Sequence, residues 1–175
     1  MHRRPTTLHQ VADVSDSLEG FGRHFRDWLH ELRLWSSRSQ VAAAITQEPK
    51  CLAGKFAQGR VADAWLAAYA EFISERIGYP APAWSRQRKR VSPEPWFAAK
   101  LSNPVLQLGA IRDSPAPFKN RNLFTPSVDL PLRLRAGRPS KTAVEKRRTN
   151  AQRQARFRAR RQAELVRLRA MVGSN

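Results

Sequence analysis

The feature that most constrains the fold of this chain is the uneven placement of its charge. Residues 133–169 contain fourteen Lys and Arg and two acidic residues, a formal charge of +12, whereas the whole 175-residue chain carries +18. Such a segment gains little by folding against a core, because its self-repulsion is large and its apolar surface is small. All aromatic residues except Phe157 precede it. We therefore expect one core, built from the residues before the basic segment.

Three stretches before the basic segment have the apolar spacing of helices. From Ser17, apolar residues recur at steps of three and four, the spacing of one buried helical face; they are Leu18, Phe21, Phe25, Trp28, Leu29, Leu32 and Trp35. A shorter helix is predicted over Ser37–Thr46. A third helix is predicted over about Gly59–Ile77 from its apolar spacing. Gly78 and the nearby Pro80 form the stop signal at its end. We expect the three helices to pack as a small bundle.

Residues 79–99 form a proline-rich segment that holds aromatic residues and a basic run, Arg86-Gln87-Arg88-Lys89-Arg90. We expect Trp84 and the Trp96-Phe97 pair to pin this segment against the bundle. The basic run fits a phosphate contact and a solvated loop equally well. A helix-turn-helix motif is disfavoured, because the loop that carries Pro49, Gly54 and Gly59 is too long for its tight turn.

Two further helix starts are expected, at Asn103-Pro104 and at Ser114-Pro115, since proline suits the first turn of a helix. The first opens a short apolar helix with Val105, Leu106, Leu108 and Ile111. A last apolar cluster follows around Phe118, with Lys119 and Arg121 pointing away from it. Residues 125–134 are predicted to be an extended arm that leaves the domain, and no strand pattern supports a sheet.

The predicted fold class is mainly α, with a small helical bundle, a proline-rich aromatic segment and a long basic C-terminal helix that is partly disordered when unbound. Residues 1–14 show no periodicity, so we expect a flexible arm there. The helical domain then covers residues 15–132, and the basic nucleic-acid-binding tail covers residues 133–175.

Three short blocks resemble a known group of proteins. They are PAW at 82–84, EPWF at 94–97 and SPAPFKNRNLF at 114–124. They are similar to blocks of small, largely uncharacterised bacterial proteins encoded beside nucleotidyltransferase or toxin genes. The resemblance covers about residues 18–124 and implies a helical accessory or antitoxin-like domain. It supplies no active-site residues.

The start of the basic tail combines a loop and a helix signal. Residues 135–139, Arg-Ala-Gly-Arg-Pro, resemble an AT-hook core, which lies in the narrow minor groove of A·T-rich DNA. An ordinary loop before a helix explains them as well. Thr142 and Glu145 then form a capping box, and no Gly or Pro follows until Gly173, so a long helix is predicted.

The middle of the tail has two further likenesses. Asn150, Arg158 and Leu168 keep the spacing of the basic region of leucine-zipper transcription factors. We expect no zipper, however, because about one heptad follows Leu168 in this sequence. The block AQRQARFRARR, at 151–161, is also similar to basic segments of short plasmid and phage DNA-binding proteins. A sequence-independent basic tail stays an equal alternative to specific recognition.

These features predict a nucleic-acid-binding accessory protein or transcriptional regulator, because Lys and Arg gain affinity by releasing counterions from phosphates. DNA is the favoured ligand. An RNA-binding role and neutralisation of a toxin or nucleotidyltransferase from an adjacent gene stay open, and the helical domain would bind a protein partner or form a homodimer. The candidate nucleic-acid contacts are Arg135, Arg138, Lys141, Lys146, Arg147, Arg148, Asn150, Arg153, Arg156, Arg158, Arg160 and Arg161.

Motifs for catalysis and metal binding are missing from the sequence. Cys51 is the only cysteine, and His24 and His30 are six residues apart, so they do not share a helical face as metal ligands at i and i+4 would. We expect no enzyme activity, no catalytic residue, no cofactor and no metal. No apolar run is long enough for a secretion signal or a membrane span, so we expect a cytoplasmic protein without a membrane partner that associates with the nucleoid when bound to DNA.

Overall fold

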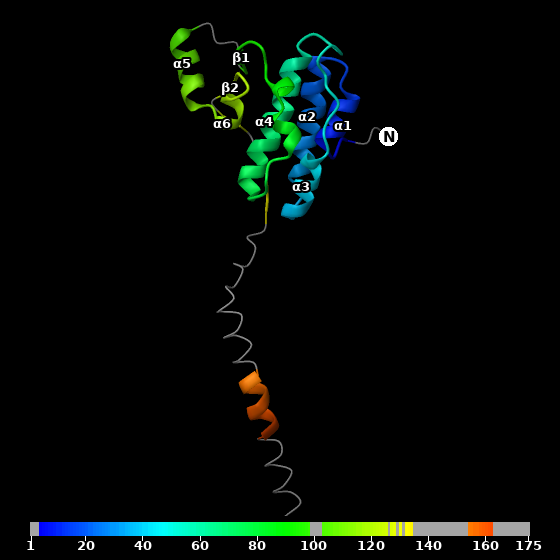
Figure 1. Cartoon of the computed structure of the whole chain (residues 1–175), viewed down its shortest axis with the longest axis vertical. Helices are drawn as coiled ribbons and strands as arrows, with labels where there is room; N and C mark the ends of the chain where they lie inside the picture. Colours follow the sequence, from blue (N-terminus) through cyan, green and yellow to red (C-terminus); the bar gives the residue numbers. More distant parts are fainter. Residues whose placement is uncertain are drawn as a thin grey trace, which may run out of the picture. The chain divides into compact units, whose positions relative to one another are not determined.

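The computed structural model confirms a mainly helical protein (Figure 1). Its chain divides into two units, residues 1–135 and residues 136–175, which are described separately below. The structure describes residues 4–98, 103–125, 127–128, 130, 132–134 and 154–162.

The first unit begins with helix α1 (Leu8–Val14), where the sequence predicts a flexible arm. Thr7 caps this helix by accepting a hydrogen bond from the backbone N–H of Gln10. Three side chains of α1 are fully buried: Leu8, Val11 and Ala12. The arm prediction is wrong for these residues, because an i, i+3, i+4 trio is enough to dock two helical turns on the bundle.

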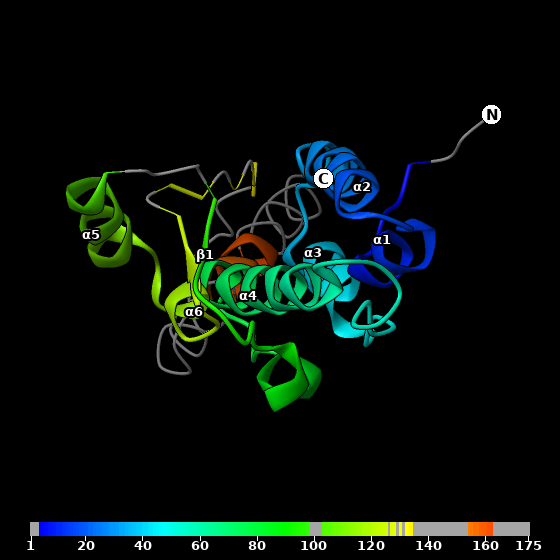
Figure 2. The same cartoon turned by 90° about the horizontal axis from the view of Figure 1, so that it is seen from above.

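The bundle itself follows the predicted pattern. Helix α2 (Leu18–Leu32) buries its aromatic face and begins at Ser17, whose Oγ accepts the N–H of Gly20 at 3.0 Å. Helix α3 (Arg38–Thr46) matches the predicted second helix. Helix α4 (Gly59–Ile77) is largely buried and ends where Gly78 takes a left-handed φ of 69°. In Figure 2, α4 lies between α1–α3 on one side and the later segments of this unit on the other.

The second half of the unit packs on the other side of α4. It contains two 3₁₀ helices, two further α-helices and two short strands: η1 (Ala83–Arg86), η2 (Arg88–Arg90), β1 (Trp96–Phe97), α5 (Pro104–Asp113), α6 (Ala116–Lys119) and β2 (Leu123–Phe124). Strands β1 and β2 pair in parallel, with Trp96 opposite Leu123 and Phe97 opposite Phe124. Two-residue strands are too short to show an alternating pattern, so the sequence could not predict this pairing.

Phe118 joins the second half to α4. Its ring lies edge-on to the rings of Trp65, Tyr69 and Phe72, with centroid distances of 5.4, 5.3 and 5.8 Å. Edge-to-face contacts at these distances are favourable beyond the area that they bury. The predicted apolar cluster is therefore part of the main core.

The described residues of the segment 125–134 do not leave the domain as predicted. Their alternate apolar side chains pack against the core and are partly buried; they are Val128, Leu130, Leu132 and Leu134. In an extended chain, every second side chain lies on the same side. A proline-rich segment can therefore cover a core without forming a helix.

Candidate nucleic-acid interface

Residues 154–162 form a helix within the basic tail, and all nine side chains are exposed (Figure 1). This helix contains four of the twelve candidate nucleic-acid contacts: Arg156, Arg158, Arg160 and Arg161. The other eight lie outside the described residues, as do the AT-hook-like segment and the capping box; they are Arg135, Arg138, Lys141, Lys146, Arg147, Arg148, Asn150 and Arg153.

The four arginines lie on two sides of this helix. With 3.6 residues per turn, Arg156 and Arg160 lie one turn apart on one side, and Arg158 and Arg161 lie about one turn apart on the other. Phe157 lies between the two pairs and is exposed. Residues 154–162 include no acidic residue, so the helix carries a formal charge of +4 without an ion pair of its own. Such a surface attracts phosphate groups from several directions.

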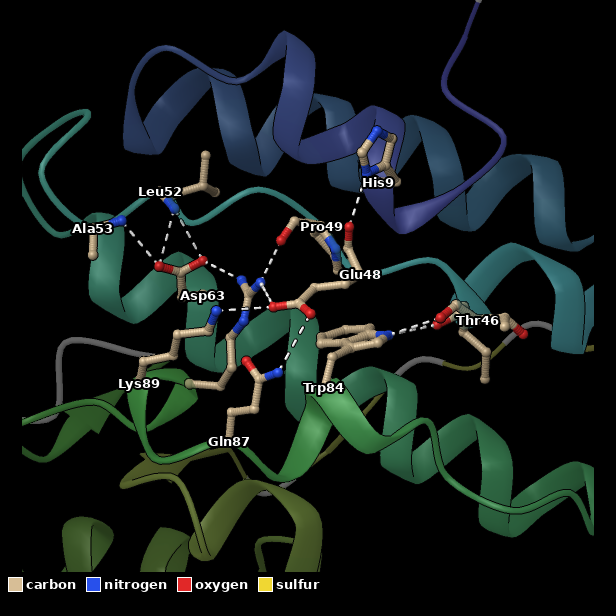
Figure 3. A network of polar contacts seen from close by, with 12 residues as sticks. His9, Thr46, Glu48, Pro49, Leu52, Ala53, Asp63, Trp84, Gln87 and Lys89 are labelled. Atoms are coloured by element: carbon tan, nitrogen blue, oxygen red, sulfur yellow. Dashed lines mark hydrogen bonds and ion pairs between the residues drawn. The ribbon is translucent and has the colours of Figure 1, made fainter.

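The basic run of the proline-rich segment, unlike the exposed helix of the tail, includes a buried arginine. Arg90 is 0% exposed, and its Nη1 donates a hydrogen bond to Oδ1 of Asp63 at 2.6 Å (Figure 3). Its Nη2 donates to the backbone carbonyl of Pro49. Both interpretations of this run, a phosphate contact and a solvated loop, are therefore wrong for Arg90. This residue is a buried structural cation.

Asp63 holds the segment before α4 as well as the segment after it. Its carboxylate accepts the backbone N–H of Leu52 at 3.0 Å and that of Ala53 at 2.9 Å, in addition to the guanidinium of Arg90 (Figure 3). Asp63 is also 0% exposed. Buried charges are tolerated when they are paired and hydrogen-bonded, and this pair meets both conditions. Asp63 is not among the residues predicted from the sequence, although it is the only acid in the alanine-rich apolar run of residues 61–70, which is a usable signal.

Trp84 extends the same network to the end of α3. Its Nε1 donates to the backbone carbonyls of Ile45 and Thr46, each at 3.1 Å, and the Arg90 guanidinium lies 5.3 Å from the centroid of its ring. Trp84 is buried. The prediction that this tryptophan pins the proline-rich segment to the bundle is confirmed.

Lys89, the neighbour of Arg90, pairs with a carboxylate at the surface. Its Nζ lies 2.9 Å from Oε1 of Glu48. The hydrogen bond from Lys89 is the main reason why the pKa of Glu48 lies below its usual value, and the same bond raises the pKa of Lys89. Gln87 donates a second hydrogen bond to this carboxylate (Figure 3). The positive charge of Lys89 is thus largely balanced within the domain.

Arg121 is the second buried arginine of the first unit. It donates hydrogen bonds to the carboxylate of Glu71 and to the backbone carbonyls of Pro117 and Ser85. The expectation that Arg121 points away from the apolar cluster is wrong, because α4 supplies a carboxylate that the local sequence does not reveal. Like Arg90, this residue stabilises the domain.

The described part of the chain holds neither a metal cluster nor a membrane-spanning helix. Among those residues, no cluster of His, Cys, Asp and Glu could hold a metal ion. None of the described helices combines the length and the hydropathy that a membrane span requires. Comparison with family models, curated proteins and solved structures finds no match for this chain, so the likeness of residues 18–124 to antitoxin-like proteins stays a prediction.

Proposed function

We propose that this protein binds nucleic acid, and DNA in preference to RNA, through its arginine-rich C-terminal segment, as an accessory or regulatory protein. The observation that carries the proposal is the segregation of charge: residues 133–169 hold +12 of the +18. The described helix at 154–162 presents all of its arginines to solvent. Each phosphate that such residues neutralise releases counterions, which favours binding.

The balance of charge in the folded unit supports the proposal that the tail, and not this unit, contacts the nucleic acid. Residues 1–132 hold 18 basic and 12 acidic residues. Several of these cations are already paired with carboxylates, and the pairs include Arg90 with Asp63, Arg121 with Glu71 and Lys89 with Glu48. Cations that are engaged in this way cannot contact phosphate without losing their partners.

The placement of arginines on two sides of the helix favours duplex DNA. The major groove of B-DNA is wide enough for an α-helix and has a phosphate backbone on each side. Arg156 and Arg160 would then contact one backbone, and Arg158 and Arg161 the other. The major groove of A-form RNA is deep and too narrow for side chains to read, so a regular RNA duplex fits this helix less well.

A salt titration of the full-length protein on duplex DNA tests the proposal. Replacing Arg156, Arg158, Arg160 and Arg161 together by Gln should weaken binding and should reduce the slope of log K against log salt by up to about 3.6, since each phosphate contact contributes about 0.9. The matched control replaces four exposed arginines of the folded unit by Gln, namely Arg23, Arg26, Arg38 and Arg60. It should leave the slope nearly unchanged.

Two results would contradict the proposal. One is an equal loss of slope in the tail variant and in the control, which would mean that only net charge matters. The other is unchanged DNA affinity and slope after deletion of residues 136–175. A structured RNA that outcompetes duplex DNA at fixed salt would retain the nucleic-acid function but would overturn the preference for DNA.

A further inference from the structure

Helix α5 exposes an apolar surface that no other described element of its unit covers. Ala110 is its only buried residue. Three side chains recur at steps of three and therefore line one side of the helix, Val105, Leu108 and Ile111. The exposed fractions are 72% for Val105, 56% for Leu106, 65% for Leu108 and 39% for Ile111. Neighbouring apolar side chains exposed to this degree mark an interaction site.

The C-terminal end of α5 is fixed to the unit. The Oγ of Ser114 donates to the carbonyl of Ala110 at 2.6 Å and accepts the N–H of Thr125 at 2.7 Å. Lys119 Nζ donates to the carbonyl of Arg112 at 2.6 Å. The helix therefore projects from an anchored end, and Figures 1 and 2 both show it apart from α1–α4.

The bundle has an apolar groove that faces solvent between α2 and α4. The groove has a volume of about 290 Å³. Its walls include Phe21, Phe25 and Leu29 from α2, Trp65 from α4 and Trp96 from β1, and Gly22 lies in the α2 wall. Aromatic and aliphatic walls of this kind accept an apolar helix. Within the described part of the chain, this apolar helix and this apolar groove are both left uncovered.

We propose that two copies of this protein form a dimer in which α5 of each copy lies in the α2–α4 groove of the other. The reciprocal exchange gives a closed two-fold assembly that covers both surfaces at once. The exposed parts of Val105, Leu108 and Ile111, which share one side of α5, amount to roughly 300 Å² on each helix. With groove surfaces of similar area, two helices bury roughly 1,200 Å², the lower end of the range for stable interfaces.

The first test measures the oligomeric state of the nuclease-treated full-length protein by sedimentation equilibrium. The wild type should be a dimer, and Leu108→Glu and Gly22→Glu should both be monomers. A Cβ at Gly22 meets no atom within 4 Å, and Leu108 is exposed, so both variants should keep the fold. Leu34→Glu is the control, because Leu34 is 74% exposed but lies outside α5 and outside the groove walls. It should remain dimeric.

The second test measures proximity directly. In a Cys51→Ser background, the chain has no other cysteine. Leu108→Cys protein mixed with Gly22→Cys protein and oxidised with copper phenanthroline should give a disulfide-linked heterodimer, whereas Leu34→Cys mixed with Gly22→Cys should not.

Three results would overturn the proposed dimer: a monomeric wild type, a Leu108→Glu variant as dimeric as the wild type, or cross-linking no faster than in the control. A monomeric wild type that binds a different protein through α5 would also refute it. Neither test involves nucleic acid, so the dimer and the proposed function can fail separately.

Discussion

The buried pair of Asp63 and Arg90 allows the sharpest prediction about stability. Asp63→Ala removes the buried carboxylate that is hydrogen-bonded to Arg90 and the acceptor for two backbone N–H groups. Among the described carboxylates, it leaves Arg90 with only the longer contact to the exposed Glu48, at 3.5 Å. An uncompensated buried charge costs about 3–5 kcal/mol. Each unsatisfied buried N–H adds about 1–3 kcal/mol, less where water can enter. Glu48 still compensates part of the Arg90 charge, so we expect a loss of about 5 kcal/mol in the free energy of unfolding.

The partner variant should behave differently. Arg90→Met leaves Asp63 with its two backbone donors, so the expected loss is smaller, about 3 kcal/mol. The double variant Asp63→Ala/Arg90→Met should lose less than the sum of the single variants, by about 2 kcal/mol, because no isolated charge remains. The loss in Asp63→Ala is comparable to the whole stability of many domains, which is about 5–15 kcal/mol.

Equilibrium unfolding of the full-length protein in urea, followed by tryptophan fluorescence and circular dichroism, measures these differences. The control is Asp113→Ala, which breaks the exposed ion pair of Asp113 with Arg112 and should have no measurable effect. The reasoning is refuted if Asp63→Ala unfolds within about 1 kcal/mol of the wild type, or if the two single variants are additive.

Three further stability predictions concern smaller changes, and urea unfolding measures each of them. Gly59→Ala should lower the free energy of unfolding by about 1–3 kcal/mol, because the new Cβ would lie 1.9 Å from the backbone carbonyl oxygen of Leu52. A Cβ at Gly22 has open space, so Gly22→Ala should stabilise α2 by about 1 kcal/mol. Equal effects of the two substitutions would contradict this steric argument. Trp84→Phe should cost about 1 kcal/mol, since it loses the indole hydrogen bond to the end of α3; an unchanged urea midpoint would exclude that role. The pKa of Glu48 is lowered in the folded state, so its pair with Lys89 stabilises the protein above the ordinary value of 4.5, and this contribution is lost as the pH falls through the lowered pKa. Glu48→Gln should flatten that part of the pH profile, and an unaltered profile would show that the pair is irrelevant.

The long helices could be predicted from the sequence because their signals are local. The aromatic residues of α2 recur with the helical period, and Gly78 marks the end of α4. Helix α1 was missed because two turns hold too few apolar residues to show a period. Its burial depends on contacts with the bundle, which the local sequence does not contain.

Buried ion pairs could not be predicted for a related reason. Arg90 and Asp63 are 27 residues apart, and Arg121 and Glu71 are 50 apart, so neither pair leaves a local pattern. Arg90 lies inside a basic run that resembles a solvated loop. In the candidate interface, by contrast, the exposure of Arg156 and its neighbours follows from composition alone, because a helix without an apolar face has nothing to bury.

The position of Asp63 also has a consequence for the order of folding. The residue lies near the start of α4 and links a loop 10 and 11 residues earlier to a 3₁₀ helix 27 residues later. The contacts with Leu52 and Ala53 span only 11 and 10 residues and cost little loop-closure entropy, so they can form before the pairing of β1 with β2, which spans 27 residues as the Asp63–Arg90 pair does. Asp63 thus lies where a folding nucleus is expected, and its loss should slow refolding more than it speeds unfolding.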